Sequence, residues 1–308
     1  MKERPIPPVP ANQAEHHPPL RGPARAPLLA LGALVASMVS LCVGSSFAKT
    51  LFPVLGAAGT TALRLAFAAG LMLAIARPWR RPPAARDLRL LAFYGLVLGG
   101  MNLCIYQAIA RIPFAVAIAI ELAGPLTLAI LASRRPRDLL WTGLTLLGLA
   151  LLLPWQIDAT ALDPRGIAFA LAAAACWAAY IVLGQRLGHL PSLQATALGL
   201  LAAALVVVPW GLPAWQPILQ IPALLGWGLF VAVFSSALPY SLEMAVLPHL
   251  SKPVLGSWLS LEPVIGALTA WLILGEHLSA SQALAIACIV IACAGSARSQ
   301  PPRPPAAQ

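Results

Sequence analysis

Charged side chains are scarce in this 308-residue sequence: Asp, Glu, Lys and Arg together make up 10% of it, whereas hydrophobic residues make up 59%. A soluble globular domain carries roughly 25% charged residues. A chain of this length could not bury so much apolar surface in water, so the composition excludes a soluble globular protein. It fits a lipid bilayer, in which each spanning helix needs about 20 apolar residues.

The sequence also lacks the motifs by which enzymes and ATP-driven machines are recognised. It has no HExxH, no GxSxG and no aspartate-rich pair, and only Asp158 and Asp163 cluster at all, in a loop. It has no GxxxxGK(S/T) phosphate loop, so direct use of ATP is not expected. The five cysteines lie in apolar segments without the spacing of zinc ligands. We therefore expect no enzymatic activity, no cofactor and no metal.

What the sequence does contain is a series of long, continuous apolar segments. Lipid offers no partner to backbone polar groups, so these segments should be helices, and their continuity excludes a β-barrel. We predict an all-α membrane protein with ten transmembrane helices. The segments are 28–47, 56–76, 88–109, 112–132, 139–153, 166–187, 192–210, 222–247, 254–273 and 281–297.

Two terminal segments differ from the rest of the chain. Residues 1–27 and 298–308 are rich in proline and have no apolar run, which predicts disordered tails. With the N-terminus in the cytoplasm, most of the 20 Lys and Arg residues fall on the cytoplasmic side, and Lys49, Arg111 and Arg165 fall on the other. The positive-inside rule then places both termini in the cytoplasm. The net charge of +10 thus reflects orientation in a membrane, and we expect no nucleic-acid partner.

The chain also repeats itself. TALRL at 61–65 recurs as TALGL at 196–200, and the run around Glu121 has a counterpart around Glu262 in SLEPVIGALTA, 260–270. An odd number of spans in each half would insert the second half upside down, giving two inverted five-helix repeats with a site near the midplane. The predicted domains are a tail at 1–27, a first repeat at 28–153, a periplasmic linker at 154–165, a second repeat at 166–297 and a tail at 298–308.

Several stretches resemble one family of membrane transporters. FYGLVLGGMN at 93–102, ELAGPL at 121–126, ACWAAYIVLGQR at 175–186 and LEPVIGALTAWLILGE at 261–276 are similar to the bacterial threonine/homoserine exporter family RhtA. That family belongs to the drug/metabolite transporter superfamily with paired EamA domains. The resemblance implies ten helices, cytoplasmic termini and export of threonine, homoserine and related amino acids. It assigns no substrate contact residue by residue.

Four charges appear to lie inside the apolar segments: Arg64, Glu121, Glu243 and Glu262. A charge at a helix centre costs roughly 2.5–3.5 kcal/mol on insertion scales. These side chains should therefore face the protein interior, where they pair or line a wet cavity. Pairing Arg64 with one glutamate leaves two acids that must be solvated, protonated or turned toward a substrate. This excess of buried acid is the main pointer to function.

Helical spacing groups further polar residues with these charges. Asn102 and Tyr106 are four residues apart, Tyr240 and Glu243 three, and Trp258 and Glu262 four, so each pair shares a face of its helix. Proline interrupts a helix and frees a backbone carbonyl for a ligand. The candidate site residues are Glu121, Glu262, Arg64, Asn102, Tyr106, Tyr240, Glu243 and Trp258, and the candidate helix breaks are Gly124, Pro125 and Pro263.

Each candidate has a structural alternative. Glu121 and Glu262 serve either substrate or proton binding or a structural ion pair, and Glu243, nearer a span end, could instead snorkel to the cytoplasmic interface. Arg64 could simply be the partner of a buried acid, and Trp177 could simply pack.

The function these features favour is a secondary transporter of the inner membrane, working by alternating access on an amino-acid substrate. Glutamates suit the substrate ammonium, whereas Arg64 or a broken-helix N-terminus suits its carboxylate, and Tyr and Asn side chains suit a substrate hydroxyl. Proton coupling and facilitated exchange are both open, as are the substrate range and the oligomeric state. The competing functions are a broader exporter of metabolites or drugs, a membrane-embedded enzyme and a channel.

Overall fold

The computed structural model describes residues 25–112, 114–133, 136–152, 162–265, 268 and 280–298. Within these ranges the chain is helical apart from short connections and contains no strand, which confirms the predicted all-helical class. The predictions for most of both tails, most of the linker at 154–165 and the end of the segment at 254–273 lie outside the described residues.

The described helices follow the predicted apolar segments to within a few residues at most ends. In chain order they are α1 (Arg25–Ala76), α2 (Ala85–Ile109), α3 (Phe114–Glu121), α4 (Ala123–Ala132), α5 (Pro136–Leu152), α6 (Pro164–Arg186), α7 (Ser192–Gly211), α8 (Gln216–Gln220), α9 (Ala223–Ala232), α10 (Leu238–Val246), α11 (Lys252–Leu259) and α13 (Ala280–Arg298). The π-helical turn η4 (Val233–Ala237) joins α9 to α10, and residues 261–265 are also helical.

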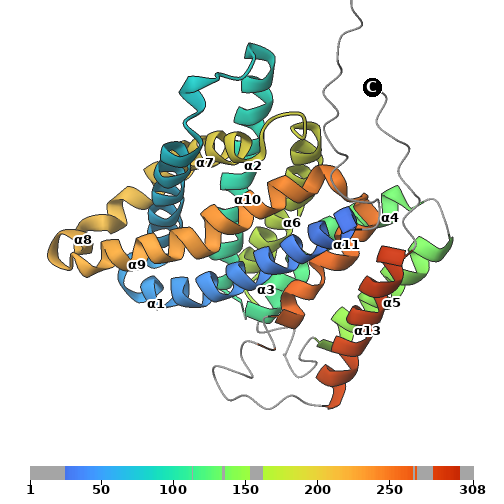
Figure 1. Ribbon diagram of the computed structural model, residues 1–308. Helices are drawn as coiled ribbons and strands as arrows, with labels where there is room; N and C mark the ends of the chain where they lie inside the picture. Colours follow the sequence, from blue (N-terminus) through green and yellow to red (C-terminus); the bar gives the residue numbers. More distant parts are fainter. Residues whose placement is uncertain are drawn as a thin grey trace, which may run out of the picture.

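The helices pack mainly against partners far away in the sequence. α1 runs alongside the continuous helix formed by α9, η4 and α10, and it also packs on α7 (Figure 1). α2 lies against α6 and α7, α3 and α4 lie against α6, and α11 lies against α4. α5 and α13 form a pair at one side of the molecule (Figure 1). Elements from both predicted halves therefore surround the same interior.

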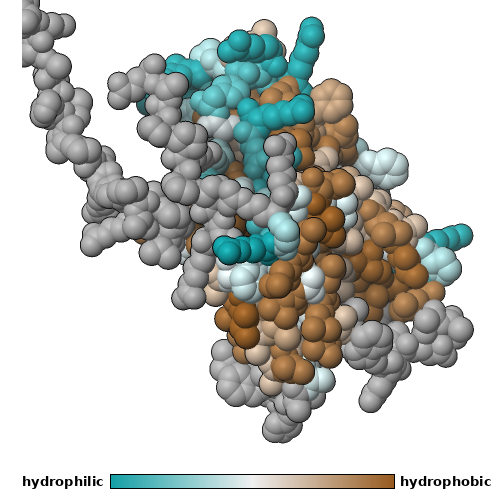
Figure 2. Space-filling view, turned by 90° about the vertical axis from the view of Figure 1, so that its right-hand side faces the viewer, coloured by the Kyte–Doolittle hydropathy of each residue, from teal (hydrophilic) through white to brown (hydrophobic). Residues whose placement is uncertain are grey.

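The surface of the molecule is suited to lipid. In the part of the chain that the structure describes, five helical segments are long and apolar enough to cross a membrane: Leu29–Arg80, Ala85–Ile109, Pro164–Arg186, Ser192–Gln220 and Ala223–His249. Large apolar side chains such as Leu131, Leu205 and Leu219 are exposed. Figure 2 shows a broad hydrophobic area on one face, with hydrophilic side chains gathered at its end. Apolar surface of this extent marks contact with a membrane rather than with water.

α1 contains a sharp bend that the predicted segments at 28–47 and 56–76 anticipate. Gly56 has φ 64° and ψ 173°, a conformation open essentially to glycine alone, and Pro53 lies just before it. The helix before the bend is longer than predicted, because it continues past residue 47 as far as the bend. Lys49, which the charge count placed on the non-cytoplasmic side between the segments 28–47 and 56–76, therefore lies within a helix.

Prolines set two further interruptions. α3 ends and α4 begins around Leu122, three residues before Pro125, and α11 ends before a turn at Ser260, three residues before Pro263. In each case proline has no N–H for the carbonyl four residues earlier. Each interruption thus lies three residues before its proline, on the N-terminal side of the predicted position. Pro125 itself fits in the first turn of α4, where helix N–H groups need no partner inside the helix.

Candidate functional site

A cavity of about 70 Å³ lies in the interior between elements of both predicted halves. Its walls come from α1, α2, α3, α6, α10 and the stretch 261–265, so no single helix forms it. A buried water needs roughly 10–15 Å³ of such space, so the cavity holds several waters or part of a small polar molecule. Seven of the eight predicted site residues line it: Glu121, Glu262, Arg64, Asn102, Tyr106, Tyr240 and Glu243.

Asn102 is the centre of the polar network on one side of this cavity. Its Oδ1 accepts hydrogen bonds from Tyr240 Oη, at 2.9 Å, and from Arg64 Nη2. Its own Nδ2 donates to the Leu98 carbonyl one turn earlier, at 2.8 Å, which fixes the amide orientation. The side chains of α1, α2 and α10 are thereby tied together. All three polar residues are buried, so this network holds α1, α2 and α10 in one arrangement.

The contacts of Arg64 within the described residues are with neutral groups. Besides Asn102, its Nη1 donates to the Ser235 carbonyl at 3.3 Å, and its guanidinium lies 4.6 Å from the centre of the Tyr106 ring. The Ser235 carbonyl is available because Pro239, four residues later, has no N–H to donate. The expected ion pair between Arg64 and a glutamate is not formed: in the described part of the chain, no carboxylate lies within 4.0 Å of its guanidinium.

Glu243 is the best-anchored of the three glutamates. Its two carboxylate oxygens accept hydrogen bonds from Ser37 Oγ at 3.1 Å and from Tyr180 Oη at 3.0 Å. The side chain is 6% exposed, so the alternative in which it snorkels to the interface is wrong. The helix of α10 turns it inward, where α1 and α6 supply its donors. Glu243 thus joins α1, α6 and α10 at one side of the cavity.

Glu121 and Glu262 have a different environment. Glu121 is 6% exposed and Glu262 is partly buried, and both line the cavity. Among the described residues, no hydrogen bond or ion pair engages either carboxylate. The expected surplus of two interior acids is therefore present, although the third acid is satisfied by hydroxyl groups rather than by Arg64.

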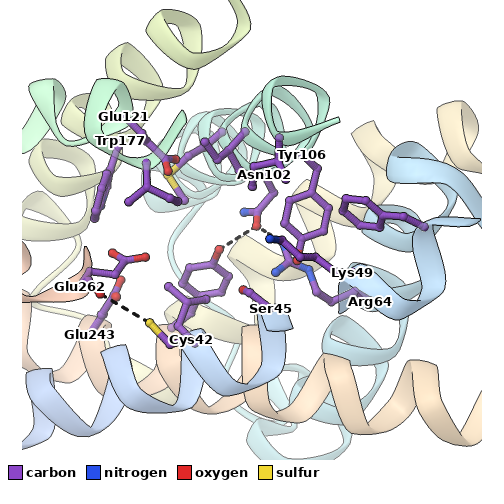
Figure 3. A pocket seen from close by; sticks show the side chains of 17 residues that line it. Cys42, Ser45, Lys49, Arg64, Asn102, Tyr106, Glu121, Trp177, Glu243 and Glu262 are labelled. Atoms are coloured by element: carbon purple, nitrogen blue, oxygen red, sulfur yellow. Dashed lines mark hydrogen bonds between the residues drawn. The ribbon is translucent and has the colours of Figure 1, made fainter. Parts of the chain in front are cut away.

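Charge is separated across the cavity. Figure 3 shows Glu121, Glu243 and Glu262 together on one side, and Arg64 and Lys49 with Tyr106 on the other. Trp177 lies beside Glu121, so it faces the cavity as well as packing in the core. An arrangement with an anionic and a cationic end suits a small zwitterion, whose ammonium and carboxylate need opposite surroundings.

Trp258 is the predicted site residue that the structure places elsewhere. Its indole Nε1 donates to the Cys293 carbonyl on α13 at 2.9 Å, and it does not line the cavity. The four-residue spacing to Glu262 predicts a shared face only for a continuous helix. The interruption at Ser260 separates the two residues, so the spacing argument does not apply.

The sequence argument missed several residues that the structure brings to the site. Lys49 lines the cavity, and Ser37 and Tyr180 bind Glu243. The only signal for Lys49 was its place just after the apolar segment 28–47, and a lysine there commonly reaches the membrane interface instead. Ser45, which also lines the cavity, lies four residues earlier and so shares its helix face. Ser37 and Tyr180 carried no such signal, since hydroxyl side chains are common in transmembrane helices.

Close helix packing positions Glu121. A Cβ added at Gly124 would lie 2.0 Å from the carbonyl oxygen of Ala174, so α4 approaches the backbone of α6 as closely as glycine permits. This contact lies one turn after Glu121 and holds the interruption between α3 and α4 against α6. Gly124, predicted as part of a helix break, therefore provides close packing as well.

The chain resembles known transporters over most of its length. Residues 164–298 match the EamA-like transporter family. The threonine/homoserine exporter RhtA of Salmonella typhimurium strain LT2 is 44% identical over 263 residues, covering 85% of this chain and 89% of that protein. RhtA of Escherichia coli strain K12 is 43% identical with the same coverage. A protein crystal structure at 19% identity shares the fold, with a TM-score of 0.71 and coverage of 91% of this chain and 100% of that chain.

Proposed function

The chain belongs to the RhtA family of threonine/homoserine exporters, and from this premise we propose how it works. It is a transporter of the bacterial inner membrane, not an enzyme, and it exports threonine, homoserine and related amino acids from the cytoplasm. The observation that carries the mechanism is the cavity with glutamates at one end and cations at the other. The rest of the mechanism follows from that separation of charge.

Glu121 and Glu262 are the residues that bind the substrate ammonium. Both carboxylates face the cavity without a partner among the described residues, whereas Glu243 already accepts two hydrogen bonds. The substrate carboxylate then points to the cationic side, and its hydroxyl lies near Asn102 and Tyr240. Threonine and homoserine share this set of groups, which explains how one cavity serves both.

Export is driven by the proton gradient. The cavity is lined by more carboxylates than cations, and within the described residues neither Glu121 nor Glu262 has a counter-ion at contact distance. Protonating one of them reduces repulsion when the substrate is absent, and an arriving ammonium replaces the proton. Efflux that is unchanged when the proton gradient is collapsed would exclude this coupling and leave facilitated exchange.

The proposed architecture is ten transmembrane helices in two inverted five-helix repeats, 28–153 and 166–297. At 1.5 Å per residue, a straight helix the length of α1 would far exceed a hydrocarbon core of about 30 Å, so the bend at Gly56 marks the turn between two crossings. The matched interruptions before Pro125 and Pro263 support the repeat. With most Lys and Arg on one side, both termini lie in the cytoplasm, and alternating access follows from rocking of the repeats around the cavity.

The test is efflux of preloaded radiolabelled threonine and homoserine from cells that lack their own exporters. Wild type and Glu121→Gln are compared at matched membrane abundance, with Asp138→Asn on α5, outside the cavity, as the control. We expect fast efflux in wild type and control and a loss of about tenfold or more in Glu121→Gln, because a charge-assisted contact is removed. Wild-type efflux at background would refute the substrate assignment.

A further inference from the structure

Lys49 is a cation at the cavity for which the family resemblance gives no role. It lies on α1 three turns after Ser37 and lines the cavity on the same side as Arg64 and Tyr106 (Figure 3). Its side chain is exposed, whereas that of Arg64 is 2% exposed. Lys49 lies two turns before the bend at Gly56, where the long stem of a lysine can carry its ammonium either to the membrane interface or into the cavity.

Arg64 is poorly placed to be the only cation for a substrate carboxylate. Its guanidinium is already fixed by Asn102, by the Ser235 carbonyl and by the face of the Tyr106 ring. Lys49 differs because its ammonium is a compact charge with three rotatable donors on a flexible stem. Its ammonium can therefore adjust to the position of a ligand, whereas these contacts hold the guanidinium of Arg64 in one place.

Two buried donors on this side have no hydrogen-bond partner among the described residues. They are Arg64 Nε and Tyr106 Oη, and both residues line the cavity. Arg64 is 2% exposed and Tyr106 is 4% exposed, so neither is satisfied by bulk water. Buried donors are normally paired, and those that are not call for a reason. A carboxylate, which accepts several hydrogen bonds and donates none, is the ligand that would satisfy them.

We propose that Lys49, with the unpartnered donors of Arg64 and Tyr106, forms a carboxylate subsite that restricts export to amino acids with a free carboxylate. This deepens the proposed function and rests on it. The subsite admits threonine and homoserine and discriminates against their amino alcohols, esters and amides, which keep the ammonium but lose the anionic end. Lys49 makes the principal charge contact, and Tyr106 adds a neutral hydrogen bond.

The test uses inside-out membrane vesicles, in which export appears as uptake of labelled threonine. The competitor is L-threoninol, which has a hydroxymethyl group in place of the carboxylate. In wild type, we expect the half-inhibitory concentration of threoninol to be at least about tenfold higher than that of unlabelled threonine. In Lys49→Gln, the concentration of unlabelled threonine that gives half-inhibition should rise about 10- to 100-fold. The corresponding concentration of threoninol should change little, so the preference for threonine over threoninol should be lost.

Two further variants separate this role from a structural one. Lys49→Arg keeps the charge and should restore most of the preference, and Tyr106→Phe removes a single hydroxyl and should reduce it several-fold. Lys252→Gln is the control, since Lys252 lies outside this cavity.

An unchanged preference in both Lys49→Gln and Tyr106→Phe would overturn the subsite and leave Lys49 as a residue that reaches the membrane interface. Equal loss for threonine and threoninol in Lys49→Gln would also overturn it, because the contact would not involve the carboxylate. Absence of threonine uptake in wild type would refute the proposed function itself, and the subsite with it.

Discussion

Gly124 gives the most direct link between helix packing and the position of Glu121. In Gly124→Ala, the new Cβ would lie 2.0 Å from the Ala174 carbonyl oxygen and 2.8 Å from its carbon, both of them backbone atoms. Neither can rotate away, so α4 must retreat from α6. The matched variant is Gly143→Ala on α5, where an added Cβ meets nothing within 4 Å.

The magnitude follows from comparing the two variants. Alanine is favoured over glycine in a helix interior by about 1 kcal/mol, a gain that applies in full at Gly143 and at most in part at Gly124, the second residue of α4. Overpacking adds a cost of about 1–3 kcal/mol at Gly124 alone. Gly124→Ala should therefore be less stable than Gly143→Ala by about 1–3 kcal/mol, and export should fall because the retreat of α4 displaces Glu121.

The assay is thermal unfolding of both purified variants in one detergent, alongside threonine efflux at matched abundance. For a chain of this size, each kcal/mol corresponds to a few degrees or less in apparent Tm. We expect Gly143→Ala to match or exceed wild type in both readouts and Gly124→Ala to fall below it in both. Equal melting temperatures for the two variants would refute the close approach of α4 to α6.

Three other changes test separate parts of the structure. Tyr180→Phe removes a hydrogen bond to the buried Glu243 and should lower the unfolding free energy by about 1.5–3 kcal/mol. An apparent Tm equal to that of wild type in a thermal scan would show that the contact is absent. Trp258→Phe removes a hydrogen bond to a backbone carbonyl on α13 and should lower the unfolding free energy by about 1 kcal/mol. The threonine affinity should stay unchanged, since Trp258 lies outside the cavity. A weaker affinity would show that Trp258 contributes to the site. Gly56→Ala should lower membrane abundance, because the backbone conformation of Gly56, with φ 64° and ψ 173°, costs a residue other than glycine about 1–3 kcal/mol. The control is Gly70→Ala, at a position with open space and no such strain. Equal abundance of the two variants would contradict the bend.

The helices and their interruptions could be predicted because they depend on local sequence. Apolar length and the absence of backbone partners in lipid fix where helices form. The missing N–H of Pro125 and Pro263 fixes where two of them are interrupted, although not on which side of the proline the interruption falls. Inward orientation of Arg64 and Glu121 follows equally simply from the cost of exposing a charge to lipid.

The pairing of interior groups could not be predicted, because it depends on which helices meet. Arg64 was expected to bind a glutamate, yet it binds Asn102 and a carbonyl freed by Pro239, since α2 and η4 bring those acceptors closer. Glu243 finds hydroxyl donors from α1 and α6 that the sequence does not mark. Lys49 was misplaced because the helix before Gly56 is longer than its most apolar stretch.

The central claim is that threonine and homoserine bind in the cavity between the glutamates and the cations. Ser45 lines that cavity, and its neighbour Ser46 is exposed and does not. The decisive measurement is the rate of maleimide labelling of Ser45→Cys and Ser46→Cys, each in a transport-competent variant without the five native cysteines, with and without substrate. Threonine and homoserine should slow labelling at position 45 and leave position 46 unchanged. Equal labelling rates at position 45 with and without saturating substrate would contradict the claim.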